Sequence, residues 1–385
     1  MEDTQTEPGA APDSVGYAPR ELVLLGAGLA HVQVLAHLAR HPLTQARITL
    51  VAPLGRLLYA PMLSGFVAGH HGLDDCAIAL EPLVRKSGVR WLQRSVRALD
   101  AQTQHVLLDD GSSLRYDWLS VNTGPVQNRA LLDITIPGIR EYGLFVRPLE
   151  SFAALWPKVA AMGDERGLRI AVIGNGAAGV ELALAVRQRL PQAALTLIGP
   201  QTPDAGLAKA AQAMLAPALR ARRITSLVDQ VVRVERDQLT LGSGARLACD
   251  ISLVAVGAQA PLWLKDSGLD LDHQGFIAVN ACQQSTSHAQ VLAAGDVSSR
   301  VDVPHARNAA YALRSGAALA HNLVQLVQQQ ALRTHRVPSS LAQWLALGDG
   351  RAIVSRGRFA GLGRLWAWLK QRRDRRTVDR LRAKP

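Results

Sequence analysis

RIAVIGNGAAGVE, residues 169–181, is the stretch that decides the fold. An apolar run leads into Gly174 and Gly176, and a helix-compatible segment follows with Gly179 near its start. In a turn of this kind the glycines let the backbone approach a diphosphate, and the helix N-terminus offers its free N–H groups to that anion. The stretch therefore predicts a β-α-β unit that binds a dinucleotide.

The same order of strand, turn and helix occurs earlier, in ELVLLGAGLAH at residues 21–31. Gly26 and Gly28 hold the two turn positions and Ala30 follows them, but His31 replaces the third glycine. That glycine normally permits close packing of the helix on the strand. Two interpretations of the histidine are open: it fills packing space in the helix, or it lies near a bound diphosphate or ribose.

A second motif follows each glycine-rich turn. Gly-x-x-Leu-x-x-Asp, with a further glycine seven residues after the aspartate, spans residues 111–124 and again 244–257. Each copy is typical of a hairpin that leads into an apolar strand ending at a glycine turn. Because two motifs recur in the same order, the sequence indicates two copies of one nucleotide-binding plan. We expect Thr123 and Gly124 at the first nucleotide and Gly257 at the second.

A third signal is VLAAGDV, residues 291–297, where an apolar strand ends in Gly295 and Asp296. After two β-α-β repeats, such a carboxylate is expected to bind a ribitol hydroxyl of a flavin. Glu181 lies two residues past the last glycine of the second turn. It is either a solvated helix residue or a side chain that projects toward a nicotinamide.

Neither copy carries the acidic residue that usually binds the ribose hydroxyls at the end of the second strand. The strand ends are Ala52-Pro53 and Gly199-Pro200, and no Asp or Glu lies between Leu22 and Leu73 or between Leu182 and Pro203. The choice between NADH and NADPH is therefore open at this stage.

The net charge of +12 is concentrated at the C-terminus. Residues 351–385 hold 12 Arg or Lys and two Asp, so the rest of the chain is near neutral. Within this tail, an apolar stripe with helical spacing is expected at Leu362, Leu365, Trp366 and Leu369. The tail is either an amphipathic helix lying on an anionic membrane surface or a helix packed on the body. No nucleic-acid recognition module is visible, so we expect no nucleic-acid partner.

The three cysteines, Cys76, Cys249 and Cys282, form neither a Cys-x-x-Cys pair nor a zinc-binding spacing. We therefore expect no metal site and a reduced, cytoplasmic protein, peripheral on the cytoplasmic membrane face if the tail binds lipid. No apolar run reaches the length of about 18 residues that a membrane span needs. Residues 1–19 are rich in Pro, Gly, Ser and Thr and are expected to be a disordered leader.

Together these signals predict an α/β protein with two Rossmann-like domains, of which the FAD-binding domain is split in sequence. We expect its two parts at residues 20–147 and 263–330, with the NAD(P)-binding domain at 148–262 between them. A long helix is expected at 306–326. The C-terminal region, 331–385, is expected to hold a hairpin around residues 348–350 and a basic helix from 361 onward.

The order GAGLAH, VNTG, GNGAAGVE, AVG and AAGD resembles the FAD-dependent pyridine-nucleotide oxidoreductases with two Rossmann-like domains. Residues 59–69, 348–353 and 365–370 resemble the type II NADH dehydrogenase-like group, closest to the branch linked or fused to selenophosphate synthetase. The resemblance implies FAD and NAD(P)H as cofactors and a quinone or small molecule as acceptor. The flavin carries the chemistry, so no acid–base triad is expected.

The chain departs from that family at two places. The first-domain helix, residues 30–40, has no cysteine, so a disulfide relay is not expected. Two glutamines usual in type II NADH dehydrogenases become Ala310 and Arg314. Arg314 is either a cation near the flavin or a surface charge, and Tyr311 either stacks near the flavin or packs in the core. Two alternatives stay open: a reductase of a soluble protein or of a selenium or sulfur species, and a flavin-binding partner without turnover. The oligomeric state has no signal in the sequence.

Overall fold

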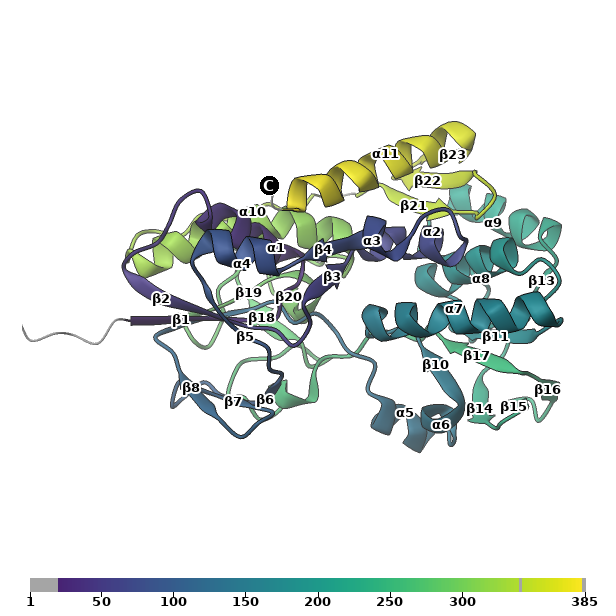
Figure 1. The fold of residues 1–385 in the computed structure, drawn as a ribbon, viewed down its shortest axis with the longest axis horizontal. Coiled ribbons are helices and arrows are strands. Elements are labelled where there is room, and N and C mark those ends of the chain that lie inside the picture. Colours follow the sequence, from purple (N-terminus) through teal and green to yellow (C-terminus); the bar gives the residue numbers. More distant parts are fainter. Residues whose placement is uncertain (1–19, 339–340, 383–385) are drawn as a thin grey trace, which may run out of the picture.

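The computed structural model describes residues 20–338 and 341–382, so the leader expected at residues 1–19 lies outside the described residues. Two parallel five-stranded sheets form the centres of two α/β domains that lie side by side (Figure 1). Each sheet carries one of the two glycine-rich turns. The α/β fold class with two Rossmann-like domains is therefore confirmed.

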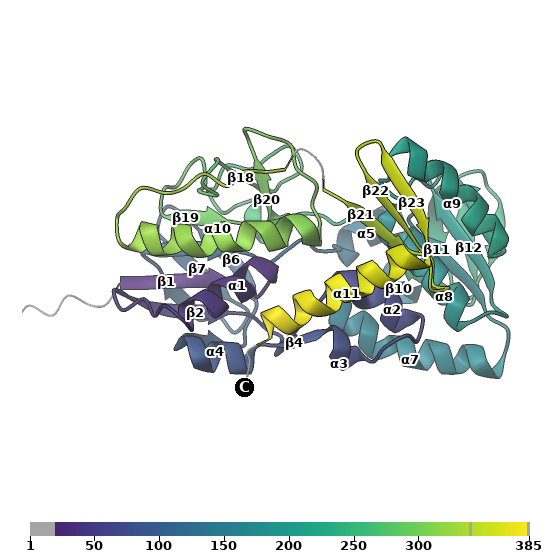
Figure 2. The same cartoon turned by 90° about the horizontal axis from the view of Figure 1, so that it is seen from above.

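The first sheet has the strand order β19-β9-β1-β2-β5. Four of its strands precede the second domain in sequence and the fifth follows it: β1 (Arg20–Leu25), β2 (Ala46–Val51), β5 (Arg90–Leu92), β9 (Trp118–Val121) and then β19 (Val291–Ala293). Helices α1 (Leu29–Leu38) and α10 (Ala309–Val327) pack against each other (Figure 2). The chain leaves this domain and returns to it, as the split FAD-binding domain requires.

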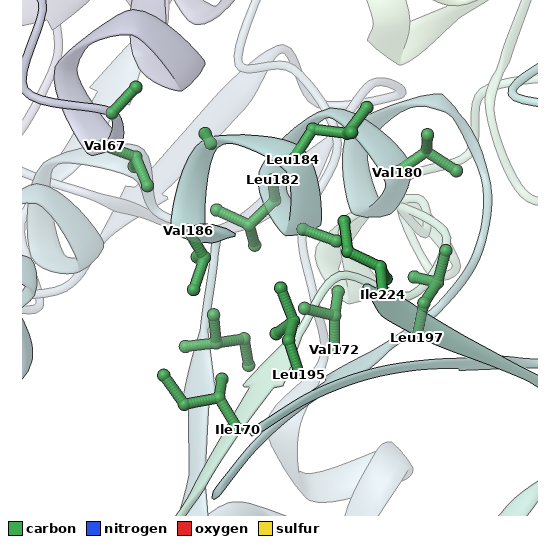
Figure 3. Packing of buried hydrophobic residues seen from close by; sticks show 14 of the residues in the cluster. Val67, Ile170, Val172, Val180, Leu182, Leu184, Val186, Leu195, Leu197 and Ile224 are labelled. Atoms are coloured by element: carbon green, nitrogen blue, oxygen red, sulfur yellow. The ribbon is translucent and has the colours of Figure 1, made fainter. Parts of the chain in front are cut away.

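The second sheet has the order β10-β17-β11-β12-β13. Its strands are β10 (Gly143–Phe145), β11 (Arg169–Ile173), β12 (Ala194–Gly199), β13 (Ile224–Val228) and β17 (Ile251–Val254), with helices α7 (Leu149–Glu165), α8 (Ala177–Arg189) and α9 (Lys209–Ala221). Successive strand residues point to opposite faces, so Ile170 and Val172 join one core and Ala171 and Ile173 the other. Figure 3 shows Leu182 and Val186 of α8 facing the strand side chains of the first of these cores.

The repeated Gly-x-x-Leu-x-x-Asp motif has the same structural role in both domains. Its aspartate accepts a hydrogen bond from the first part of the central strand: Asp117 Oδ2 from Glu21 N (2.7 Å) and Asp250 Oδ2 from Arg169 N (2.8 Å). The N–H groups of the two aspartates donate in return to the carbonyl oxygens of the same two residues. The aspartate thus joins the amino-terminal ends of two adjacent parallel strands.

Smaller elements surround the two domains. One antiparallel sheet consists of β6 (Val96–Asp100), β7 (His105–Leu108) and β8 (Ser113–Arg115), and another of β14 (Val231–Val234), β15 (Gln238–Leu241) and β16 (Arg246–Ala248). Two further strand pairs are β3 (Arg56–Leu58) with β4 (Ala77–Ala79) and β18 (Ile277–Val279) with β20 (Ser298–Arg300). The short helices are α2 (Leu63–Val67), α3 (Leu73–Cys76), α4 (Glu81–Ser87), α5 (Arg129–Thr135) and α6 (Ile139–Tyr142), and the 3₁₀ turns are η1 (Ala60–Met62), η2 (Leu262–Leu264) and η3 (Gly295–Val297).

The C-terminal region forms the expected hairpin and one strand more. β21 (Gln343–Ala346) pairs with β22 (Ala352–Arg356), and β22 pairs with β23 (Phe359–Gly363). Helix α11 (Arg364–Leu381) then begins three residues later than the expected start at residue 361. The reason is that residues 359–363 form ladder hydrogen bonds with β22, in which Leu362 lies opposite Ile353.

The apolar stripe expected on this helix is wrong. Leu362 belongs to β23, and Leu365 is 61% exposed. The buried positions of α11 are instead Lys370, Asp374, Val378 and Leu381. The last two join the core of the first domain, so the helix runs from the C-terminal sheet back across that domain (Figures 1 and 2).

Candidate functional site

The first glycine-rich turn lies at the carboxyl ends of β1 and β9. Gly26 has a positive φ of 84°, and a Cβ added there would lie 2.5 Å from Thr123 Cα. Its N–H donates to Val51 O at the end of β2 (2.8 Å). The turn therefore needs glycine at this position and places Thr123 directly against it.

Asn122 is a residue of this site that our sequence reasoning missed. Its Oδ1 accepts hydrogen bonds from the N–H groups of Ala30 and His31 (both 3.1 Å), and its Nδ2 donates to Ala294 O (2.6 Å). It thereby caps α1 from the neighbouring strand and ties that strand to the one before Gly295. The VNTG segment was the available signal, but we read only its last two residues.

His31 lies beneath the turn, fully buried. Its Nδ1–H donates to Gly26 O (2.5 Å) and its Nε2 accepts from Ser120 Oγ (2.8 Å), which assigns the tautomer from the partners. Burial lowers the pKa of the imidazole to about 4, against the raising effect of the Gly26 carbonyl. The neutral ring thus supports the turn from within the core, as in the packing interpretation.

The second glycine-rich turn is closely packed on one side and open on the other. Gly174 has a φ of 107°, and a Cβ there would lie 2.5 Å from Ala255 O. A Cβ at Gly179 would collide with the carbonyl oxygen of Gly174, so α8 approaches the turn closely. In contrast, a Cβ at Gly176 or Gly257 would meet no atom within 4 Å. The open side is where a diphosphate has room.

The start of α8 offers unused hydrogen-bond donors to that open side. Within residues 20–338 and 341–382, the N–H groups of Ala177, Ala178 and Gly179 have no acceptor. Three free N–H groups at the positive end of a 13-residue helix form an anion site. At α1 two of the equivalent N–H groups already donate to the side chain of Asn122. Fewer backbone donors are therefore left for a ligand at α1 than at α8.

Glu181 has partners other than those expected near a nicotinamide. Its Oε1 accepts from Ala346 N (2.9 Å) and lies 3.7 Å from Lys370 Nζ. Lys370 Nζ also donates to Pro61 O (2.5 Å) and to Asp374 Oδ2 (3.0 Å). The glutamate thus connects α8 to the C-terminal region rather than standing as a solvated helix residue.

Asp296 carries the observation that best fits a flavin. Its Oδ1 is buried and has no hydrogen-bond partner among the described residues. Burial raises the pKa of this carboxyl, while Arg147 and then Arg307 lower it. A buried acceptor without a donor costs free energy unless a ligand satisfies it. A hydroxyl-bearing ligand such as the ribityl chain of FAD fits this place. Gly124 follows the neighbouring strand β9 by the same number of residues as Asp296 follows β19, and its Cβ position is open.

Tyr311 and Arg314, the two other residues considered for the flavin site, differ in burial. Tyr311 is buried and stacks on His305 with ring centroids 3.9 Å apart. Arg314, in the same helix, is exposed. This exposure agrees with a helix-surface charge.

At the expected ribose position of the second site the structure shows an amide instead of an acid. The Asn175 side chain donates to Gln201 O and fills the space beside Gly199. Asp229 lies next to the same strand end, because its N–H donates to Gly199 O (3.0 Å), but its carboxylate accepts from Ser243 Oγ (2.6 Å). Both oxygens of this carboxylate thus already accept hydrogen bonds from within the protein, from Gln230 N and Ser243 Oγ.

Thiol and metal chemistry find little support in the described part of the chain. All three cysteines are free, and burial raises the pKa of Cys76 to about 12 and that of Cys249 to about 11. In the same residues no group of three His, Cys, Asp or Glu side chains could hold a metal ion. None of the described helices combines the length and apolar character needed to cross a bilayer.

An apolar pocket opens between the two domains and α11. It is lined by Met62 of η1, Ala185 of α8, Ala346 of β21 and Ala367 and Lys370 of α11. Further lining residues are Pro61, Ser64, Gly65, His70, His71, Gly348, Gly350, Arg351, Gln371, Asp374 and Arg375. The lining thus combines apolar side chains from both domains with basic and acidic ones.

These features define a protein with two dinucleotide-binding domains, one of which carries a flavin-type Gly-Asp turn. The family described as pyridine nucleotide-disulphide oxidoreductase matches residues 20–316. The chain belongs to this family, whose members use FAD and NAD(P)H.

Two curated proteins and one solved structure illustrate the similarity. Demethylphylloquinone reductase NdbB of Synechocystis sp. is 34% identical over 45% of this chain and 44% of its own length. The alternative NAD(P)H-ubiquinone oxidoreductase C1 of Arabidopsis thaliana is 26% identical over 78% of this chain and 66% of its own length. The chain thus spans less than two thirds of both. The structure of NDH2 from Plasmodium falciparum with NADH has a TM-score of 0.79 at 12% identity, covering 94% of this chain and 97% of that one, and shows the fold.

Proposed function

We propose that this protein is an NAD(P)H-dependent FAD oxidoreductase that passes electrons from the nicotinamide nucleotide through flavin to a quinone. The observation that carries the proposal is the coexistence of an unsatisfied carboxylate at Asp296 with unused helix donors at α8. Each of these groups lacks a hydrogen-bond partner that one of the family's two cofactors can provide. Two relatives whose names specify quinone reduction support the choice of acceptor.

The two cofactors have separate binding residues in this proposal. FAD is held by the turn at Gly26 and Gly28, by Leu29 N–H of α1, and by Asp296, with Thr123 and Gly124 alongside. The nicotinamide nucleotide is held by the turn at Gly174 and Gly176 and by the N-terminus of α8, with Gly257 opposite. When bound, FAD would supply the hydride-accepting chemistry, and these residues would supply position and electrostatics.

The apolar pocket is the proposed entrance for the quinone. Its lining of Met62, Ala185, Ala346 and Ala367 suits an apolar ring. We expect Ala367→Trp to fill this pocket. The variant should raise KM for short-chain quinones about tenfold or more, a loss of about 1.4 kcal/mol of binding, and leave NADH reduction of the flavin unchanged.

A stopped-flow comparison of the two half-reactions tests this assignment. If Ala367→Trp slows flavin reduction and quinone turnover equally, the pocket is not the acceptor site. Faster turnover with a soluble protein or with selenium or sulfur acceptors than with quinones would contradict the quinone proposal itself. FAD that NADH and NADPH both fail to reduce would indicate a flavin-binding partner without turnover.

The surface beside the pocket is proposed to lie on an anionic membrane at the cytoplasmic face. Four large apolar side chains are exposed on β23 and the first turns of α11: Phe359, Leu362, Leu365 and Trp368. Exposed arginines lie near them in the sequence, at positions 356, 358, 364 and 372, and the Arg372 guanidinium stands over the Trp368 ring. Apolar side chains with basic neighbours bind the headgroup region of anionic bilayers.

Vesicle sedimentation tests the membrane contact. The full chain should sediment with vesicles that contain phosphatidylglycerol and be released by high salt, because salt screens the arginines. The double variant Leu365→Glu/Trp368→Glu should stay in the supernatant. Leu155→Glu, at an exposed position on α7, is the matched control and should bind as the wild type does. Equal sedimentation of all three proteins would contradict the contact.

A further inference from the structure

Arg307 is a fixed cation beside the candidate flavin site to which neither the sequence nor the comparisons assign a role. It lies two residues before α10. Its guanidinium donates to Asp272 Oδ2 (2.8 Å) and Gln274 Oε1 (2.7 Å), and it stands 3.7 Å from the centre of the Phe276 ring. Two hydrogen bonds and a stacking contact hold the group in one orientation, so little side-chain entropy is left to lose on binding a ligand.

The third nitrogen of this guanidinium, Nε, carries an N–H group that has no acceptor among the described residues. Arg307 Nε is buried and, among the described residues, without a partner. Asp296 Oδ1 is buried and unsatisfied in the same way, and the two groups are not bonded to each other. An unsatisfied buried group costs about 1–3 kcal/mol, more when it is charged. A donor and an acceptor left open near each other indicate a ligand that can both accept and donate.

Packing places both groups at the same end of α10. The turn η3, which contains Asp296, packs against this helix, since a Cβ at Gly295 would lie 3.6 Å from Ala312 Cβ. The charges of Arg147 and Arg307 both reach the Asp296 carboxylate and lower its pKa. The N-terminus of the 19-residue helix adds its own positive end at this point. The charges of two arginines and a helix N-terminus thus act on the Asp296 carboxylate, while the Asp272 carboxylate pairs with Arg307.

We propose that Arg307 is a flavin-site residue whose Nε–H donates to bound FAD and whose fixed charge raises the reduction potential of the flavin. A positive charge held near the flavin ring favours its electron-rich reduced form. Arg314, the arginine that the sequence suggested for this role, is exposed on the helix surface. The inference rests on FAD binding alone, so it stands whether or not a quinone is the acceptor.

Three variants separate this role from a structural one. Arg307→Gln removes the charge, and Arg307→Lys keeps the charge but removes the Nε donor. Arg314→Gln, the matched control, removes an exposed charge from the helix that follows, α10. The measurements are the dissociation constant of FAD, the midpoint potential of the bound flavin by equilibration with a redox dye, and the thermal midpoint of unfolding.

We expect Arg307→Gln to weaken FAD binding about tenfold and to shift the ratio of reduced to oxidised flavin about tenfold, which is about 30 mV for a two-electron couple. Arg307→Lys should weaken binding but keep most of the potential, and Arg314→Gln should change neither. The proposal is overturned if Arg307→Gln keeps the wild-type affinity and potential. If Arg307→Gln does not fold, Arg307→Lys decides: wild-type FAD affinity in that variant would overturn it. Quinone turnover of the wild type is measured in parallel. A wild type that binds FAD and is reduced by NADH or NADPH but does not reduce quinones would contradict the proposed function and leave this inference standing.

Discussion

At the scale of single residues, the turns combine positions that need glycine with positions that need only empty space. Gly26 and Gly174 have positive φ and closely approach the next strand, so any side chain would force the backbone to move. Gly176 has extended backbone angles, φ −69° and ψ −177°, and open space beside it. It is therefore a position where function and folding can be separated.

Gly176→Val should fold as the wild type does and lose nucleotide binding. A Cβ at this position meets no protein atom within 4 Å, and the valine side chain extends into the space proposed for the diphosphate. We expect an unchanged thermal midpoint and FAD content, with KM for NADH raised about tenfold or more. Gly167→Val is the control, because a Cβ there makes only an ordinary contact, 3.8 Å from Gln192 O, away from the site. A normal KM in Gly176→Val would show that the nucleotide lies elsewhere.

His31 should make the stability of the first domain depend on pH. Its folded pKa of about 4 lies below the ordinary value of 6.5, so the folded state prefers the neutral ring. This contribution is fully present above pH 6.5, declines as the pH falls, and is lost at about pH 4. The shift corresponds to about 3 kcal/mol.

The measurement compares wild type with His31→Gln by denaturant unfolding between pH 4 and 8. The difference in unfolding free energy should shrink toward low pH, because only the wild type must bury a neutral imidazole. A difference that stays constant over this range would contradict the account.

At the scale of elements, the sequence predicted what depends on local pattern and failed where distant segments meet. The strand-turn-helix units and the hairpin at residues 348–350 follow from glycine spacing and apolar runs, and all are present. The inward face of α11 could not be read from periodicity. It buries Lys370 and Asp374 because Pro61 O, from a turn 309 residues earlier, supplies an acceptor for the lysine. Asn122 was missed for the same reason, since its role appears only when two strands lie side by side.

The buried pair on α11 should behave as a unit. Lys370→Met leaves the Asp374 carboxylate buried with Arg373 as its remaining side-chain ion-pair partner, so we expect a loss on the order of 3 kcal/mol in unfolding free energy. The double variant Lys370→Met/Asp374→Leu should recover part of that loss, because the buried Asp374 carboxylate is removed together with the lysine, while Glu181 keeps its hydrogen bond from Ala346 N. Additive losses in the double-mutant cycle would show that the pair does not interact.

At the scale of the whole molecule, both domains have the same β-α-β arrangement, and the C-terminal helix connects the two domains. The first sheet is completed by β19 after the chain has built the second domain. Helix α11 places Lys370 between Glu181 of the second domain and Pro61 of the first. This arrangement brings the two glycine-rich turns and the apolar pocket into one structure, as the proposed transfer of electrons in two steps requires.

An anaerobic titration of the purified protein with NADH and with NADPH tests the central claim most directly. We predict a yellow protein with about one FAD per chain, whose flavin absorbance bleaches on addition of one of these nucleotides and returns when a quinone is added. A colourless protein that takes up no FAD, or a bound flavin that neither nucleotide bleaches, would contradict the account.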